Sequence, residues 1–451
     1  MEQADLTTGN VRQRLLEFAL PFFLANLMQA TYGAMDLFTV GRFTSTSAVS
    51  SVNIGSQAMQ LVTVFVTGIF LGTTVSIGGA IGMDDRKREK SAILSSRRIL
   101  AAAATALTAL LLLLIRPLIG WMQTPEEAVN ETATYLHICV FGIPFIAIFN
   151  CYAAILRGHG DSRRPMQAVF MACVTNIAGD LILTGAMGLG VTGVAIATVS
   201  AQGMSALGAW IFARQAVHES STAPDAENQP GLCRQILKIG IPIAMQDTLI
   251  NISFMILTLV ANRRGLAASS AVGVVEKLIS FMFLVPSAML SAVTTFTAQN
   301  LGAGKRDRVR EAVRTGILVT ALFGALMCLS SWLFPSALTS VFTRDPVVIR
   351  DADEYLKSYS VDCILVSVTF ALNGCLCGSG HSFVAFLHNT LAIFLVRIPA
   401  AFILSSAFPD SMFPMGFASP LGSIFSILFL CCWFRFWKNS SKNTLSGHLP
   451  A

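Results

Sequence analysis

Asp36 and the polar residues that precede it are the first place where this sequence could do chemistry. Residues 20–42, LPFFLANLMQATYGAMDLFTVGR, form an apolar run long enough to cross a membrane as a helix. An ionised carboxylate in hydrocarbon costs at least about 3 kcal/mol, so an acid inside such a run indicates function. Tyr32 and Gln29 precede Asp36 by one and two helical turns, so the three side chains share one face. An acid that merely reaches toward lipid headgroups would leave this polar stripe unexplained.

Two acids, an amide and a hydroxyl fall in one layer of the first half of the chain. At about 1.5 Å per residue, Asp36, Asp180 and Thr198 lie roughly 9, 8 and 12 Å below the outer ends of their helices. Asn176 lies one turn from Asp180 on the same face. Such oxygen ligands suit a hard cation such as Na⁺. Two close carboxylates can equally share a proton, so this layer predicts a site for H⁺ or Na⁺.

The composition predicts a polytopic membrane protein. Of 451 residues, 54% are hydrophobic and only 12% are charged, whereas soluble domains carry about 25% charged residues. The net charge of +6 does not imply nucleic-acid binding, because cytoplasmic loops of membrane proteins are rich in Lys and Arg. The ten cysteines have no zinc-site spacing, and no HExxH or G-x-S-x-G motif occurs. We therefore expect neither an enzyme nor a cofactor other than the coupling ion.

Twelve apolar runs predict an all-α membrane protein with two six-helix bundles. The predicted helices lie near residues 15–40, 48–80, 92–116, 132–155, 165–185, 191–213, 234–260, 271–299, 312–336, 355–377, 382–405 and 413–437. We expect an N-terminal lobe at 1–213, a polar cytoplasmic linker at 214–233, a C-terminal lobe at 234–437 and a cytoplasmic tail at 438–451.

The distribution of basic residues predicts the orientation. Of the 31 Lys and Arg residues, 22 fall on the side that holds both termini and the even-numbered connections. The positive-inside rule therefore places both termini in the cytoplasm, as expected for a multi-pass protein of the plasma (inner) membrane. We expect a monomer that is surrounded by membrane lipids.

The two halves of the chain repeat one another in the order and spacing of their motifs. Gly82 corresponds to Gly302, and Pro21 corresponds to Pro242. Because six helices is an even number, the repeat is parallel, and two such halves predict a substrate path between them with alternating access. The same correspondence places Leu257, Val396, Ala400 and Ala418 opposite Asp36, Asn176, Asp180 and Thr198. The cation layer is therefore not a requirement of the repeated fold.

Three further acids lie in the predicted spans of the second half. Asp247 is near the membrane middle, with Asn251 one turn away. Glu276 adjoins a lysine, and Asp362 lies in the tenth helix. Each could attract a cationic substrate, whereas an interhelical polar bond is an equally good explanation for Glu276 and Asp362. Arg397 requires an acid or a carbonyl partner that the sequence does not identify.

The order and spacing of several motifs resemble those of the multidrug and toxic compound extrusion (MATE) transporters. The matching stretches are the first helix ending in DLFTVGR, LRGHGDSRRP, NIAGDLILTG, GVAIAT and QNLGAGKRDRVREA. The N-half motifs are most similar to the DinF-type branch, which implies a cation site at Asp36, Asn176, Asp180 and Thr198. The resemblance also implies that Pro21 is the kink point of the first helix, with Gln29 and Tyr32 on its cavity-facing stripe.

We interpret the sequence as a cation-coupled multidrug antiporter that exports amphipathic or cationic organic compounds. The residues for a substrate cavity or gate are Pro21, Gln29, Tyr32, Asp247, Asn251, Glu276 and Asp362. The alternative is a flippase of the same superfamily for lipid-linked oligosaccharides or lipids. Such proteins tend to have a basic cavity, whereas acids outnumber basic residues five to two in the predicted spans.

Overall fold

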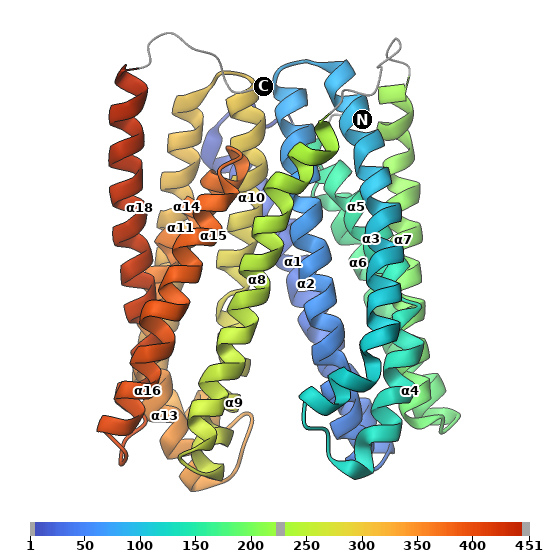
Figure 1. Cartoon of the computed structure of the whole chain (residues 1–451), viewed down its shortest axis with the longest axis vertical. Helices are drawn as coiled ribbons and strands as arrows, with labels where there is room; N and C mark the ends of the chain where they lie inside the picture. Colours follow the sequence, from blue (N-terminus) through green and yellow to red (C-terminus); the bar gives the residue numbers. More distant parts are fainter. Residues whose placement is uncertain (1–4, 222–230, 444–451) are drawn as a thin grey trace. The chain divides into compact units, whose positions relative to one another are not determined.

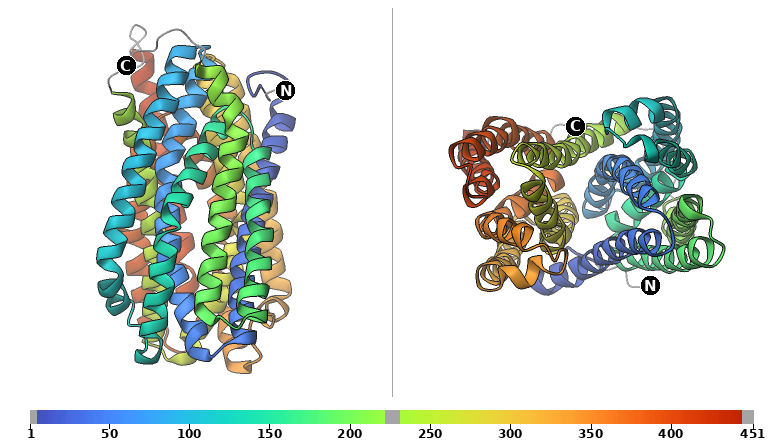
Figure 2. Two further views of the ribbon diagram at one scale, coloured as in Figure 1. Left: turned by 90° about the vertical axis from the view of Figure 1, so that its right-hand side faces the viewer. Right: turned by 90° about the horizontal axis from the view of Figure 1, so that it is seen from below.

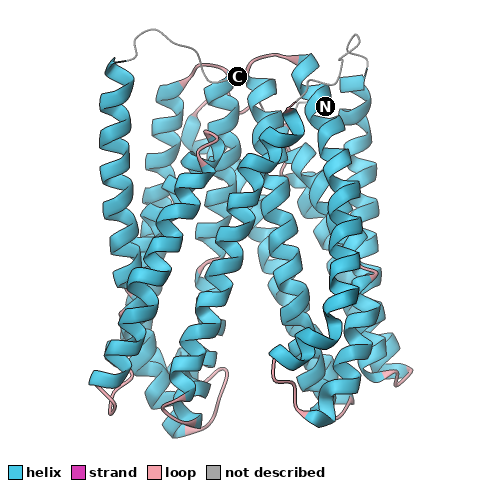
Figure 3. Ribbon diagram, in the orientation of Figure 1, coloured by secondary structure: helices cyan, strands magenta, loops and turns pink. Residues whose placement is uncertain are grey.

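A computed structural model describes residues 5–221 and 231–443, and it contains helices and no strand within these ranges (Figure 3). The first half of the chain forms α1 (Val11–Phe43), α2 (Thr46–Gly82), α3 (Arg86–Trp121), the short 3₁₀ helix η1 (Glu126–Ala128), α4 (Val129–Val140), α5 (Ile143–Gly158), α6 (Arg163–Gly179), the π-helix η2 (Asp180–Ala186) and α7 (Gly190–Ser221). The second half forms α8 (Leu232–Asn262), α9 (Leu266–Met282), α10 (Leu284–Gly302), α11 (Arg306–Leu333), α12 (Pro335–Thr339), α13 (Pro346–Ser360), α14 (Asp362–Gly378), α15 (Ser382–Leu391), the π-helix η3 (Ala392–Arg397), α16 (Ile398–Ala407), α17 (Phe413–Gly416) and α18 (Ala418–Asn443) (Figure 1).

The long helices account for the predicted spans. In the described part of the chain, eight helices are long and apolar enough to cross a membrane, or up to eleven if three bent helix pairs each form one span. The remaining predicted span is α1, whose 33 residues extend about 50 Å. The bent pairs are α4–α5, α9–α10 and α13–α14, with angles of 44°, 41° and 43°. Three helices predicted as continuous are therefore broken, two of them beside Pro144 and Pro286, where a backbone donor is missing.

Spatial proximity divides the chain into two compact units whose boundaries do not follow the sequence. Unit 1 comprises Met1–Thr248, Ser287–Val313 and Gly374–Phe383, and unit 2 comprises Leu249–Pro286, Arg314–Asn373 and Val384–Ala451. Unit 1 thus includes segments of α8, α10 and α14 from the second half. The predicted division into lobes stays a prediction, and residues 222–230 of the predicted linker and 444–451 of the predicted tail lie outside the described residues.

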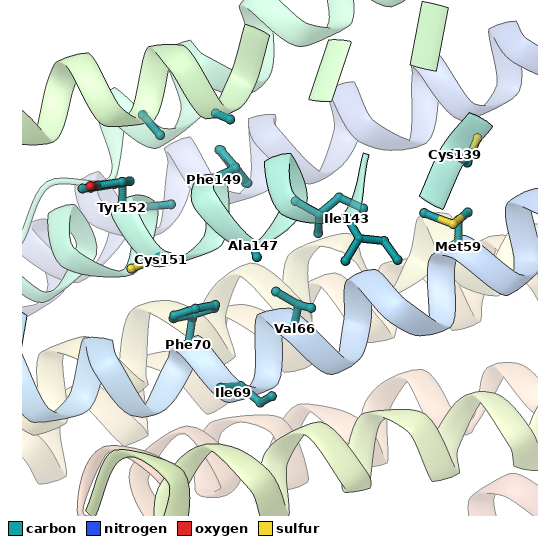
Figure 4. Packing of buried hydrophobic residues seen from close by; sticks show 14 of the residues in the cluster. Met59, Val66, Ile69, Phe70, Cys139, Ile143, Ala147, Phe149, Cys151 and Tyr152 are labelled. Carbon is teal, nitrogen blue, oxygen red and sulfur yellow. The ribbon is translucent and has the colours of Figure 1, made fainter. Parts of the chain in front are cut away.

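The core of unit 1 lies where α2 packs against α4 and α5 (Figure 4). Val66 and Phe70 of α2 are buried among Ile143 and other apolar side chains. Gly55 permits a close approach, because a Cβ atom at this position would lie 2.8 Å from the Cε1 atom of Tyr135. The fold therefore depends on a small residue in α2 at the point where a large buried ring meets it.

Two arginines at equivalent positions of the internal repeat bind the chain segments that lead into the spans of unit 1. Arg308, in α11, donates to the carbonyls of Leu6 at 3.0 Å and Gly9 at 2.7 Å, just before α1. Arg88, in α3, donates to Gln235 Oε1 at 3.2 Å, near the start of α8. Each arginine thus binds the chain near the start of the first long helix of the opposite half. The two contacts are equivalent, in agreement with the repeat seen in the sequence.

Candidate cation-binding site

Asp36, Asn176 and Asp180 come together inside unit 1. Helix α1 packs against α6 and η2, which places Asp36 beside both Asn176 and Asp180. Only 5% of Asp36 is exposed, and Asn176 and Asp180 are completely buried. The structure therefore gathers the two acids and the amide that the sequence placed in one layer.

These three side chains leave several buried polar atoms without a partner. Oδ1 of Asp36, both carboxylate oxygens of Asp180 and both polar atoms of the Asn176 amide make no hydrogen bond of ordinary geometry. Buried polar groups almost always have a partner, and each one left without costs about 1–3 kcal/mol. A proton shared by the carboxylates, or a Na⁺ ion held by carboxylate and amide oxygens, would supply the missing interactions. The donor set therefore fits either ion.

The described residues contain no group of three or more His, Cys, Asp or Glu side chains that could hold a metal ion. A metal cation at Asp36 and Asp180 would therefore require amide, hydroxyl or backbone oxygens in addition to the two carboxylates. Such a set of oxygen ligands is typical of hard cations and unlike the nitrogen and sulfur ligands of zinc.

Asp180 begins the π-helix η2, which the sequence did not predict. A π-helix has one more residue per hydrogen-bonded turn than an α-helix, and such segments are frequent at functional sites. The preceding residue, Gly179, permits close packing of α6 on α7, because a Cβ atom there would lie 2.9 Å from the Cβ atom of Ala197. The local sequence has the same apolar composition as an α-helix, so periodicity alone could not reveal the change.

Thr198 lies on α7, the helix that packs against α6 and η2. Its side chain is half-buried, and its hydroxyl donates to the carbonyl of Val194 at 2.9 Å. Because the proton is used within α7, the hydroxyl oxygen keeps its lone pairs for another ligand.

The other predicted residues of the first helix follow the polar stripe along α1. Pro21 is buried within the helix, Tyr32 is half-buried one turn before Asp36, and Gln29 is exposed. Of these three residues only Tyr32 is near Asp36. The polar stripe on α1 therefore extends from the buried carboxylate of Asp36 to the exposed side chain of Gln29.

Arg397 and Asp362 form an ion pair in unit 2. Their closest atoms, Nη2 and Oδ2, are 3.9 Å apart, and the Asp362 side chain is completely buried. The guanidinium also donates to the hydroxyls of Ser419 at 3.0 Å and Ser253 at 3.1 Å, and it lies 5.0 Å from the ring centroid of Phe254. Unit 2 therefore holds a permanently charged side chain beside its buried acid, whereas Asp36 and Asp180 of unit 1 form no ion pair with Lys or Arg in the described part of the chain.

The remaining acids predicted in the spans of the second half are Glu276 on α9 and Asp247 on α8. Glu276 accepts a hydrogen bond from Thr258 Oγ1 at 2.8 Å in unit 2, which favours the explanation of an interhelical polar bond. Asp247 and Asn251 are both half-buried on α8, with Asp247 in unit 1 and Asn251 in unit 2.

A buried pair, Glu89 and His159, was missed by sequence reasoning. His159 Nε2 lies 2.9 Å from Glu89 Oε1, and Nδ1 lies 2.8 Å from the carbonyl of Ile155. The exposed fractions are 2% for Glu89 and 7% for His159. Glu89 belongs to the run RKREK, which is typical of an exposed loop, so nothing in the local sequence indicates its burial.

An all-helical fold with many candidate membrane spans and buried acids places this protein among polytopic membrane proteins, a class that includes the transporters. The MatE family model matches residues 21–182 and again 242–403, so the two matches begin at the equivalent prolines Pro21 and Pro242. The chain belongs to the MATE family, a family of transporters and not of enzymes. Its fold is accordingly twelve transmembrane helices in two six-helix bundles.

Relatives and solved structures agree with this assignment. The probable multidrug resistance protein YoeA of Bacillus subtilis is 24% identical over 437 residues, covering 95% of this chain and 94% of the relative. The probable multidrug resistance protein NorM of Thermotoga maritima is 28% identical over 411 residues, covering 88% and 86%. A crystal structure of MATE in complex with MaL6 superposes with a TM-score of 0.91 at 20% identity, covering 98% of this chain and 100% of that chain.

Proposed function

We propose that this chain is a multidrug antiporter that uses an inward gradient of H⁺ or Na⁺ to export amphipathic, mainly cationic organic compounds. The main support is the buried cluster of Asp36, Asn176 and Asp180, in which five polar atoms make no hydrogen bond of ordinary geometry. A site with two buried carboxylates attracts a cation. The bound cation neutralises the buried carboxylates. Its binding therefore lowers the free-energy cost of packing α1 against α6 and η2 around them.

Coupling requires that the ion binds one conformation more tightly than the other. Helix α1 contains both Asp36 and Pro21, and the proline removes one backbone hydrogen bond from the helix. Occupation of the cluster by an ion would change the packing of α1 against α6, and the weakened point at Pro21 allows the helix to bend. Release of the ion on the other side of the membrane would reverse this change.

Transport measurements in proteoliposomes test the proposal. The wild-type protein, Asp36→Asn and Asp180→Asn are compared for uptake of a fluorescent cationic dye driven by a pH gradient alone or a Na⁺ gradient alone. We expect each variant to lose at least tenfold in rate while its elution profile stays normal and its thermal midpoint does not fall. Asp307→Asn is the matched control, because this acid is 94% exposed in its side chain.

Wild-type transport rates in either cluster variant would contradict the proposal. The gradient that drives the wild-type protein identifies the coupling ion, and replacing the dye by neutral compounds of similar size tests the preference for cations.

We further propose that the protein acts as a monomer in the cell membrane with both termini in the cytoplasm. The excess of Lys and Arg in the connections on that side supports the orientation. A single cysteine placed at Glu127 should react with a membrane-impermeant reagent added outside intact cells. A single cysteine placed at Asp307 should react only when the reagent has access to the inner side of the membrane. The opposite labelling would reverse the orientation.

A further inference from the structure

A groove of about 970 Å³ lies on the surface of unit 1 between α3, α5 and α7. These three helices pack against one another on one face of the unit (Figure 2, left). Much of the lining is apolar and exposed, as at Leu112, Phe145 and Leu207. Because all three helices belong to candidate membrane spans and these exposed side chains are apolar, we expect the groove to open toward lipid.

Small residues on α3 and α7 make room for the groove. Ala101 and Ala104 on α3 and Gly203 and Ala206 on α7 line it. The nearest atoms to a Cβ atom at Gly203 would belong to the ring of Phe145, at 3.8 Å, an ordinary van der Waals distance. An alanine would therefore fit there without moving the helices, so the backbone of α7 is not closed against α5 at this point and leaves space for a ligand.

The groove has a cationic and aromatic end at Arg97, with Tyr152 and Trp210 beside it. Arg97 is exposed and forms no ion pair with an acid in the described parts of the chain. The guanidinium of Arg214 lies 3.7 Å from the ring centroid of Trp210. Two arginines therefore border one end of an otherwise apolar groove.

The position of Arg97 along α3 places this end at the level of lipid headgroups. Residues 99–115 contain no charge and extend about 25 Å, close to the ~30 Å thickness of the hydrocarbon core. Arg97 and Arg98 come just before this segment. From Arg97 to Leu112 the groove follows α3 for about 22 Å, more than the ~15 Å of one leaflet.

We propose that this groove binds one anionic phospholipid, with its phosphate on Arg97 and one acyl chain along α3 toward Leu112. An arginine offers a planar fork of donors that matches phosphate oxygens, and tryptophan and tyrosine favour the membrane interface. A purely apolar ligand would leave Arg97 unpaired at the boundary of the hydrocarbon. Charge complementarity therefore selects a phospholipid with a net negative headgroup.

Native mass spectrometry of the purified full chain tests this proposal without any measurement of transport. The protein in detergent is titrated with phosphatidylglycerol, which is anionic, and with phosphatidylcholine of the same acyl chains, which is zwitterionic. We expect one phosphatidylglycerol to be retained at lower lipid concentration than phosphatidylcholine. Failure of drug transport would leave this result unaffected, so the two proposals are tested separately.

Two pairs of variants locate the lipid. Arg97→Gln should weaken retention of phosphatidylglycerol about fivefold, whereas Arg98→Gln, which is also exposed and adjacent in α3 but outside the groove, should not. Ala104→Phe should fill the groove and reduce binding of the lipid at least tenfold. Ala102→Phe, on the exposed surface outside the groove lining, is its control.

Equal effects of Arg97→Gln and Arg98→Gln would show attraction to the general positive charge of this surface and would overturn the proposal. Equal retention of both lipids by the wild-type protein, or full retention by Ala104→Phe, would overturn it as well. If Arg97→Gln does not fold, Arg97→Lys replaces it, with weaker but preserved selectivity for phosphatidylglycerol as the expected result.

Discussion

Helices α2 and α10 meet at Gly82 and Gly302, where a Cβ atom added to Gly302 would lie 3.1 Å from the Cα atom of Gly82. A Cβ atom at Gly82 would lie 2.9 Å from the carbonyl carbon of Gln299. The two glycines come from opposite halves of the chain and are equivalent in the internal repeat. Equivalent residues of the two halves therefore touch through their backbones in unit 1, where no side chain can be accommodated.

Gly82→Ala should loosen this contact. Adding a methyl group against backbone atoms costs about 1–3 kcal/mol, because the helices must move apart. We expect a lower thermal midpoint of the purified protein and a longer distance between spin labels placed at the ends of α2 and α10. Gly79→Ala is the matched control, since a Cβ atom at Gly79 has no neighbour within 4 Å. If the two variants behave alike, the contact does not depend on the missing side chains.

The membrane spans and the acid pair were predictable from the sequence for the same physical reason. A run of about 20 apolar residues has no other common use than to cross a membrane, and an acid within it is too costly to be incidental. Asp36 and Asp180 could therefore be assigned to one layer from helix geometry alone. The sequence does not reveal their exact contacts, but periodicity and depth were sufficient to bring them together.

Other features depend on tertiary contacts that no local pattern encodes. The pairing of Asp362 with Arg397 joins residues on separate helices, and the burial of Glu89 depends on His159 from another part of the chain. The π-helix that begins at Asp180 depends on how the chain packs around it. Such features require the arrangement of helices to be known first.

Asp180→Asn should stabilise the protein while it abolishes coupling. In the absence of a bound cation, two neighbouring buried carboxylates without a cationic side chain beside them are unfavourable in the folded state. An amide at position 180 would be neutral and could donate to Asp36, for an expected gain on the order of 1–3 kcal/mol. Thermal denaturation in detergent at neutral pH and without Na⁺ measures this change. A lower midpoint would show that the acid pair contributes to folding rather than to ion binding.

His381 should make stability depend on pH. It lies between α14 and α15, with Nδ1 at 3.2 Å from Ser379 Oγ, and burial lowers its pKa below the ordinary value. The unfolded chain therefore takes up a proton near pH 6.5, before the folded protein does. The contribution of His381 is constant above that pH and declines as the pH falls from about 6.5 toward the lowered pKa.

His381→Asn removes this titrating group and should flatten the decline of the thermal midpoint between about pH 6.5 and pH 5. The expected change is modest, because the ring remains partly accessible to solvent. Midpoints of wild-type and variant protein are measured at intervals across this range. Parallel curves would mean that His381 contributes nothing to the pH dependence.

Asp362 and Arg397 should show strong energetic coupling in a double-mutant cycle. Removing one member of a buried ion pair leaves the other charge unpaired, at a cost of about 3–5 kcal/mol. We therefore expect Asp362→Asn and Arg397→Gln each to destabilise the protein, and the double variant to be more stable than the sum of the single effects predicts. Glu276→Gln is the control, because the partner of Glu276 is the neutral hydroxyl of Thr258 and its loss costs less. Additive effects of Asp362→Asn and Arg397→Gln would contradict a direct pairing and would leave Ser419 and Ser253 as the main partners of the guanidinium.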